Sequence, residues 1–419
     1  MRTEILYADV EFLERPVARP LQLSSGPITK LTEARAAVRV IVAGKEATGR
    51  ASIYLSDLWA WPDDSLSHAE RNAALRRFCT TIARRLGSLC GGEPEHPLEL
   101  GLRLHDAMCA ADHPPVLARL MCASPFDAAI HDAVGIALGR SAFQLYEQPV
   151  PIPAADRYFP TLGACRAISR ILREPVKSLP AWWIVGVNDS LTTELLPLVR
   201  NGGYDCFKLK LSGKDSPTDV AQTVETFRAV KALGLGRLRL SLDSNGGNPD
   251  ADSVVDYLER LRAADPEAFE AVAYLEQPTG RDIRRYAFDW RKATRLKPVL
   301  LDEGLVDGDV LPAALEQGWS GLAVKTCKGH SFSLVVAAWA AEHKLLLALQ
   351  DLTNPGLAAI HAALFAAHIP TINGVELNSP QFTPEANREW LPRLGSLFQP
   401  RGGLHQLPFA IPAGLGSTL

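Results

Sequence analysis

The 419-residue sequence lacks features that mark several common classes of protein. Its 44 Lys and Arg residues against 47 Asp and Glu give a net charge of −3, so there is no basic excess of the kind that binds nucleic acid. No apolar run approaches the roughly 18 residues of a membrane span, and residues 1–10 lack the apolar core of a signal peptide. The sequence therefore predicts a protein that binds neither nucleic acid nor membrane, with the cytoplasm as its default location.

Cysteine is present but not in a pattern that indicates a structural role. The 7 cysteines are odd in number and scattered, and none forms a Cys-x-x-Cys pair. A disulfide framework or a zinc site is therefore not indicated, and we interpret these residues as small members of the core.

Ionisable residues end a series of short apolar segments in the second half of the chain. Two lysines alternate with apolar residues in the segment 207–211, which places both on one face of a strand. The next four segments end in Asp, Glu, Asp-Glu and Lys. The residues concerned are Lys208, Lys210, Asp243, Glu276, Asp302, Glu303 and Lys325. Their spacing of roughly 23 to 33 residues suits one strand, one helix and short loops, the repeat of a βα barrel.

The chain before these segments has a different pattern. Residues 1–50 alternate in strand fashion around a loop at Pro20–Pro27, which predicts a small antiparallel sheet. A helical pattern follows over about 66–140, with Ser124 as an expected N-cap, Pro125 as the first helical residue and Gly139 as the stop. The proline-rich stretch 149–181 favours a linker or an excursion at the bottom of the barrel over regular structure. Eight strands from Trp182 to Asn378 predict a closed parallel barrel.

Residues at the carboxyl ends of barrel strands converge on one mouth, where active sites of this fold lie. Asp243, Glu276 and Asp302 would repel one another there unless a cation lies among them. Three oxygen donors favour Mg²⁺ over zinc, which prefers His or Cys. The alternative is that each carboxylate independently caps the helix that follows it. A lysine beside a divalent cation and a second ammonium group has a lowered pKa and can act as a base.

Taken together, these motifs resemble the enolase superfamily, in particular its muconate lactonizing enzyme subgroup, which is related to mandelate racemase. The resemblance rests on Lys208-x-Lys210, Asp243 followed by Ser-Asn-Gly-Gly, Glu276-Gln-Pro, Asp302-Glu303-Gly and Lys325. The segments Ala133–Gly139 and Pro412–Gly416 extend it over nearly the whole chain. It implies a modified TIM (β/α)-barrel over 141–385, an N-terminal α+β capping domain over 1–140, and a C-terminal segment, 386–419, that packs on the cap.

The resemblance also implies roles for individual residues. Asp243, Glu276 and Asp302 would bind Mg²⁺, with Mn²⁺ as a substitute, and Lys210 and Lys325 would be acid/base groups on opposite faces of the substrate. Lys208 would bind the substrate carboxylate and depress the pKa of Lys210. Asn245 and Glu303 would support the ligands, although Glu303 also suits a cap of the next loop.

The implied activity is Mg²⁺-dependent removal of a proton α to a carboxylate, with an enediolate intermediate stabilised by the metal. A racemase, epimerase or cycloisomerase acting on a small carboxylate fits, as does a dehydratase of acid sugars or hydroxy acids. The hypothesis from a different class is a non-catalytic metal-binding barrel. A homo-oligomer, from dimer to octamer, is expected by resemblance alone.

Two features depart from the family pattern. Gln350 stands where many relatives carry Glu, with Asp351 beside it. Glu376-Leu-Asn replaces the Asp-x-Asp of dipeptide epimerases, so an amino-acid or dipeptide substrate is less supported. The loops at Leu21–Ile28 and Ser52–Pro62 are expected to close over the site. Tyr54, Trp59 and Trp61 there favour an apolar or planar substrate portion, or else pack within the cap or against a neighbouring subunit.

Overall fold

The N-terminal part of the chain forms an antiparallel sheet, as the alternating pattern predicts. The computed structural model describes residues 1–23, 26–186, 189–234, 237–351, 353–407 and 410–419. The sheet has the order β1 (Thr3–Leu23), β2 (Gly26–Val42) and β3 (Lys45–Tyr54). The expected loop at Pro20–Pro27 is wrong in extent, because β1 and β2 remain paired up to Leu23 and Gly26. A register shift between Pro16 and Leu21 lets the ladder continue past prolines that cannot donate a hydrogen bond.

Two helices, α2 (His68–Leu89) and α4 (Val116–Leu138), pack on this sheet. The helices α1 (Asp57–Ala60) and α3 (Pro97–Ala110) pack in turn against α2 and α4. At Gly49 the backbone of β3 lies against α4 so closely that a Cβ would come within 2.2 Å of Ala129 O and Ala133 N. Only glycine permits this approach, so the packing of α4 on the sheet depends on it.

The expected start of the long helix at Ser124 and Pro125 is wrong, since both residues lie inside α4. Pro125 has no N–H to donate to Met121 O, and the Ser124 hydroxyl donates to that carbonyl instead, at 2.8 Å. The helix begins at Val116, and almost every residue of it is buried. The expected stop is confirmed, because Gly139 ends α4 in the left-handed conformation with φ 67°.

The proline-rich stretch carries more regular structure than a linker. It holds α5 (Pro153–Asp156), α6 (Ala164–Ile171) and β4 (Ser178–Pro180), after η1 (Ala142–Tyr146). Prolines suit the first turns of such short helices, and Pro153 begins α5.

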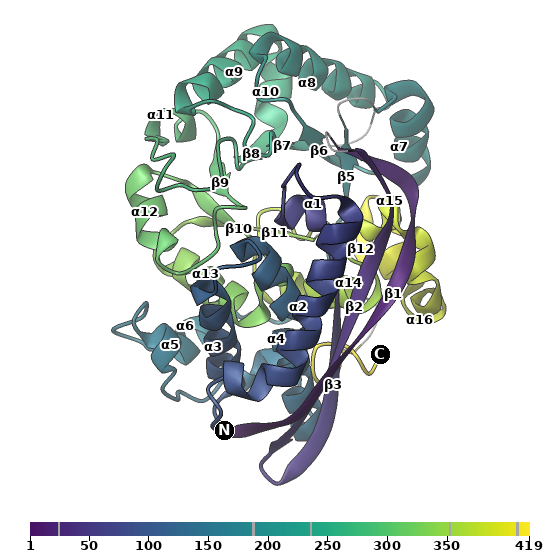
Figure 1. Ribbon diagram of the computed structural model, residues 1–419. Helices are drawn as coiled ribbons and strands as arrows, with labels where there is room; N and C mark the ends of the chain where they lie inside the picture. The colour runs from purple at the N-terminus through teal and green to yellow at the C-terminus, as the bar shows by residue number, and fades with distance from the viewer. Residues whose placement is uncertain (24–25, 187–188, 235–236, 352, 408–409) are drawn as a thin grey trace.

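The second part of the chain is a curved parallel sheet with the order β11-β10-β9-β8-β7-β6-β5. The strands are β5 (Trp182–Val185), β6 (Cys206–Lys210), β7 (Arg239–Asp243), β8 (Val272–Glu276), β9 (Val299–Leu301), β10 (Gly321–Lys325) and β11 (Leu346–Gln350). Figure 1 shows the helices after these strands on the outside of the sheet. They are η2 (Leu191–Leu195), α7 (Leu196–Gly202), α8 (Ser216–Lys231), α9 (Ala251–Ala264), α10 (Pro266–Ala271), α11 (Arg291–Thr294), α12 (Val310–Gln317), α13 (His330–Glu342) and α14 (Gly356–His368).

The barrel fold is confirmed, but its eighth strand is only partly formed. In the described ranges, the segment 374–378 pairs with the sheet at one bridge, between Gln350 and Glu376. Side chains connect it to β5 instead. The Gln381 side chain accepts from Ile184 N at 3.0 Å and donates to Ile184 O at 2.8 Å, as a neighbouring strand would. The Trp182 indole donates to Asn373 O at 2.8 Å.

The C-terminal segment contacts the cap and also adds β12 (Leu404–Gln406) to β4 as a two-stranded antiparallel sheet. It comprises α15 (Ser379–Phe382), η4 (Pro384–Trp390), α16 (Leu391–Phe398) and β12. Leu415 N donates to the buried Asp132 carboxylate of α4 at 2.7 Å. Glu389 lies 2.7 Å from the Arg35 guanidinium of β2. None of the helices in the described ranges is long and apolar enough to cross a membrane.

Candidate functional site

The ends of five neighbouring strands bring the ionisable residues of the sequence motifs together. In the sheet, β7, β8 and β9 lie between β6 and β10. Asp243, Glu276 and Asp302, at the ends of those three strands, therefore lie on the arc between Lys210 and Lys325. The register pairs Lys210 with Asp243 and Asp243 with Glu276, which brings these side chains to the same level.

The two lysines of β6 share one carboxylate. Lys208 is buried, and its Nζ lies 3.1 Å from Asp243 Oδ2 and also contacts the Glu276 carboxylate. Lys210 contacts the same Asp243 oxygen and donates to Asn245 Oδ1 at 2.9 Å. Its side chain is 31% exposed, against 4% for Lys208, so Lys210 faces the open side of the mouth.

The lysine of β10 holds the third carboxylate. Lys325 Nζ donates to Asp302 Oδ2 at 2.5 Å and to Gln350 Oε1 at 2.6 Å, and only 5% of its side chain is exposed. Gln350 in turn donates to Glu276. Gln350 thus links the Glu276 carboxylate to Lys325. An ionised glutamate at this position has no N–H to donate to Glu276.

Lys328 is a member of this cluster that our sequence interpretation missed. It lies in η3 (Thr326–Lys328) with 2% of its side chain exposed, and donates to Asp302 O at 2.6 Å and to Asp302 Oδ1 at 3.3 Å. The available signal was the spacing of three residues from Lys325. In a helical turn that spacing returns a side chain to the same side.

The eighth segment supplies a further carboxylate. Glu376 Oε2 lies 3.4 Å from Lys208 Nζ, and Glu376 Oε1 accepts from Asn378 at 3.0 Å. The neighbouring Asp351 carboxylate accepts from Asn354 at 2.7 Å and from Asn378 N at 3.4 Å. Asp351 therefore shapes the loop after β11.

Trp59 connects the cap to the site. Its ring lies 5.4 Å from Lys325 Nζ, and its indole N–H donates to Glu303 Oε1 at 3.0 Å. The same oxygen accepts from Asn245 at 3.2 Å, which also donates to Asp243. Arg281 donates to Trp59 O at 2.7 Å, so the segment of α1 is fastened to the barrel at three points.

Tyr54, in the same loop, lies away from the charged cluster. Tyr54 is fully buried, and its ring packs in a small cluster with Leu31 in the cap. Its backbone N–H donates to Asn354 Oδ1 at 2.7 Å. The alternative of packing within the cap therefore describes Tyr54. In the other expected loop, Leu21–Ile28, residues 24 and 25 lie outside the described residues.

Burial and charge act against each other in the cluster. Burial lowers the pKa of Lys325, but Asp302 and Glu303 outweigh it and hold the pKa above its usual range. Burial also acts to lower the pKa of Lys208, but the Glu276, Glu376 and Asp243 carboxylates outweigh it and raise this pKa well above its usual value. Burial raises the pKa of Glu276, and the nearby Asp243 and Asp302 add to this, against the opposing effect of Lys208. The centre of the cluster is thus short of positive charge.

A divalent cation suits this deficit. The contact set joins five carboxylates, of residues 243, 276, 302, 303 and 376, to the ammonium groups of Lys208, Lys210, Lys325 and Lys328. A substrate carboxylate would add a further negative charge to this cluster. Buried Glu303 Oε2 has no hydrogen-bond donor within the described ranges, whereas Glu276 Oε1 and Glu376 Oε2 both face the Lys208 ammonium group. Their oxygen chemistry fits Mg²⁺.

The carboxylates do not converge as a ready set of metal ligands. In the part of the chain that the structure describes, no three Asp, Glu, His or Cys groups are close enough to hold one ion. Ammonium groups lie between them, with Lys208 between Asp243 and Glu276. The donor set fits a cation, while the lysines occupy the space between the donors.

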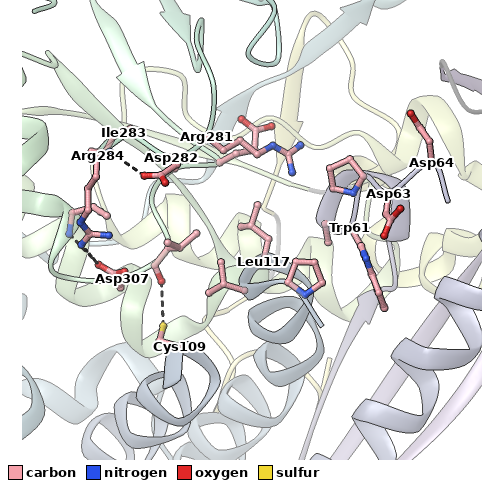
Figure 2. Close-up of a pocket in the computed structure, with 18 residues that line it drawn as sticks. Trp61, Asp63, Asp64, Cys109, Leu117, Arg281, Asp282, Ile283, Arg284 and Asp307 are labelled. Atoms are coloured by element: carbon pink, nitrogen blue, oxygen red, sulfur yellow. Dashed lines mark hydrogen bonds and ion pairs between the residues drawn. The ribbon is translucent and has the colours of Figure 1, made fainter. Parts of the chain in front are cut away.

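A cavity of about 840 Å³ lies beside the cluster, between the cap and the barrel. Its walls come from the α1–α2 segment, the α3–α4 loop, and the loops after β8 and β9. Figure 2 shows the Arg281 guanidinium pointing toward the cap side, where Trp61 and Asp63 lie. Glu303 belongs both to this cavity and to the charged cluster.

Comparisons with known proteins agree with this geometry. The family model described as enolase C-terminal domain-like matches residues 191–417, more than half of the chain. No curated protein sequence matches the chain significantly.

Among solved structures, muconate lactonizing enzyme from Pseudomonas fluorescens, complexed with muconolactone, is 17% identical with a TM-score of 0.66, over 99% of this chain and 96% of that one. A dipeptide epimerase from Enterococcus faecalis V583, complexed with Mg and a dipeptide, is 14% identical with a TM-score of 0.68, over 99% of both chains. An enolase from Bradyrhizobium, complexed with magnesium and mandelic acid, is 18% identical with a TM-score of 0.63, over 90% of this chain and 88% of that one.

At these identities the solved structures establish a shared fold, and the family model adds the family. The chain therefore belongs to the enolase superfamily, in the subgroup of the muconate lactonizing and mandelate racemase enzymes, and is an enzyme of that superfamily.

Proposed function

We propose that this protein passes through an enediolate at the α carbon of a small carboxylate substrate. A racemase or epimerase removes one α proton and returns another, and in a cycloisomerase the closing or opening of a ring bond replaces one of these two proton transfers. The observation that carries the proposal is the placement of two lysines, Lys210 and Lys325, at the two ends of an arc of carboxylates. A binding protein has no need of two such lysines, each held by a carboxylate of that arc.

The positions of the lysines give them different roles in the proposed reaction. A substrate carboxylate bound at the centre, near Lys208, has its α carbon between Lys210 and Lys325. One lysine removes the proton on its face, and the other holds or delivers a proton on the opposite face. Lys208, whose pKa the surrounding carboxylates hold high, stays charged and opposes the negative charge that develops on the carboxylate oxygens.

Asp243, Glu276 and Asp302 are the residues that would hold Mg²⁺, with Asn245, Glu303 and Gln350 orienting them. The bound ion would supply positive charge beside the substrate carboxylate and offset the carboxylates that hold the pKa of Lys325 high. The departures at Gln350 and at Glu376 with Asn378 favour a substrate without a free α-ammonium group.

The test is deuterium incorporation from D₂O into separate enantiomers of a carboxylate library, with Mg²⁺ present. Lys210→Ala should abolish exchange from one α configuration and Lys325→Ala from the other, each by about 10²- to 10⁴-fold as for loss of a general base. The exposed Lys292, 74% accessible, gives a control variant, Lys292→Ala, that should leave both exchanges unchanged. If both active-site variants lose exchange from the same enantiomer and keep it from the other, the two-faced arrangement is wrong.

A further inference from the structure

The cavity beside the charged cluster has a composition that separates an apolar interior from a charged rim. Buried Ala60, Trp61, Leu117, Ile283 and Val310 form the interior walls. Exposed Asp64 and Asp282 lie at the rim. Its volume of about 840 Å³ falls within the range of small-molecule sites, about 300–1,000 Å³.

One polar atom inside the cavity wall lacks a partner. Glu303 is 1% exposed and lines the cavity, and its Oε1 already accepts from Trp59 and Asn245. Its Oε2 is buried and has no hydrogen-bond donor among the described residues. A buried carboxylate oxygen without a donor costs free energy, which a ligand carrying an O–H or N–H at this point recovers.

The charged residues that line the cavity disfavour a ligand with a second carboxylate in it. Of the two arginines, Arg284 lies 3.4 Å from Asp307 and Arg281 donates to Trp59 O. The lining also holds Asp63, Asp64 and Asp282. A second carboxylate would therefore meet more negative than positive charge, whereas an apolar group meets the interior walls and leaves the rim in water.

We infer that this cavity takes the distal part of the substrate: an apolar group joined to the reacting carboxylate by a segment that donates a hydrogen bond to Glu303 Oε2. The inference rests on the proposed function, because Glu303 is the wall that the cavity shares with the lysine and carboxylate cluster. It assigns specificity to Glu303 and to the α3–α4 loop, and not to Tyr54.

Calorimetric binding to the full-length protein with Mg²⁺ tests the apolar part, using 2-hydroxybutanoate, 2-hydroxyhexanoate and 2-hydroxyoctanoate. Affinity should rise about two- to fourfold per methylene as the chain is buried. Val116→Trp adds bulk at a half-buried wall position and should remove this rise while leaving binding of the shortest acid within about twofold. Val306→Phe, at a second half-buried wall position, repeats the test if the first variant does not fold. Leu315→Trp, on the exposed side of α12, is the matched control and should keep the rise.

The methyl ether of 2-hydroxyoctanoate tests the donor. It should bind at least about tenfold more weakly than the hydroxy acid, since Glu303 Oε2 then stays unpaired. Glu303→Gln should remove this preference. Equal binding of ether and hydroxy acid would overturn the role of Glu303, and an affinity independent of chain length, or a rise that survives in Val116→Trp, would overturn the cavity assignment.

The two proposals fail separately. Binding that depends on chain length without proton exchange overturns the proposed reaction and leaves the cavity assignment standing. Proton exchange without any dependence of affinity on chain length overturns the cavity assignment and leaves the proposed reaction standing.

Discussion

The contact of Trp59 with Lys325 can be tested without knowing the substrate. The ring lies 5.4 Å from Lys325 Nζ, and the ammonium group is buried, with 5% of its side chain exposed. A desolvated cation–π contact of this kind is worth about 1–2 kcal/mol. Asp302, at 2.5 Å, holds the ammonium more strongly, so Lys325 stays charged at neutral pH whether or not the ring is present. Loss of the ring therefore removes only part of what holds the pKa of Lys325 high. It increases the fraction of Lys325 that is uncharged, and this fraction remains small.

Trp59→Phe and Trp59→Leu form a matched pair for this measurement. Both variants lose the indole donor to Glu303 and open similar space, but only phenylalanine keeps an aromatic face. We expect acetic anhydride at alkaline pH to label Lys325 about 3- to 10-fold faster in Trp59→Leu than in Trp59→Phe, because less of the ammonium form is stabilised. Mass spectrometry measures the rate, with the exposed Lys292 as the internal reference. Equal rates in the two variants would refute a role of the ring in holding the charge.

Three further predictions concern the cation, the long helix and the buried histidines. Glu276→Gln should weaken Mg²⁺ binding at least about tenfold in calorimetry, since affinity rises with ligand charge; the exposed Glu342→Gln is the control, and unchanged affinity in Glu276→Gln would contradict the ligand assignment. Ser124→Ala should lower the free energy of unfolding in urea by about 1–3 kcal/mol, because Met121 O loses its donor beside Pro125. Ser88→Ala, which removes a similar bond to Arg85 O at an exposed position of α2, should change the free energy of unfolding by less than about 0.5 kcal/mol, and equal losses would contradict the reasoning. His361 packs 2.9 Å from His330, and burial, its main cause, lowers the pKa of His361 to about 4. The unfolded chain then binds more protons than the folded one between about pH 4 and 6.5. The contribution of His361 to the free energy of unfolding is therefore complete above that window and falls by about 1.4 kcal/mol for each unit that the pH decreases within it. His361→Asn should reduce the slope of the free energy of unfolding against pH by that amount, and an unchanged slope would rule the group out.

The strand-end residues could be predicted because parallel strands deliver their carboxyl ends to one place. Lys210, Asp243, Glu276 and Lys325 needed only a strand pattern and a regular spacing to be placed in one mouth, and the structure brings them together. Lys328 was missed because it lies in a turn after the strand, where no alternation indicates which way a side chain points.

Other differences arise where tertiary contacts replace local signals. Ser124 and Pro125 have the sequence of a helix start, but a serine hydroxyl that satisfies the carbonyl facing the proline makes the same pair tolerable inside a buried helix. The eighth strand was expected as a full ladder, and a glutamine side chain, Gln381, makes part of its hydrogen bonds instead. A distant side chain that imitates backbone leaves no periodic pattern to find.

The unequal exposure of the two lysines has a consequence for isotopes. Lys210 is 31% exposed and trades its protons with bulk water, whereas Lys325 lies under Trp59 with 5% exposed. In the proposed reaction, a hydron taken up by Lys325 exchanges with solvent more slowly than one taken up by Lys210, so it returns more often to the carbon it came from. A hydron taken up by Lys210 is diluted by solvent before it can return. The enzyme would then show more internal return on the face of Lys325 than on the face of Lys210, so that the label in the product records which face the substrate presented to the buried side.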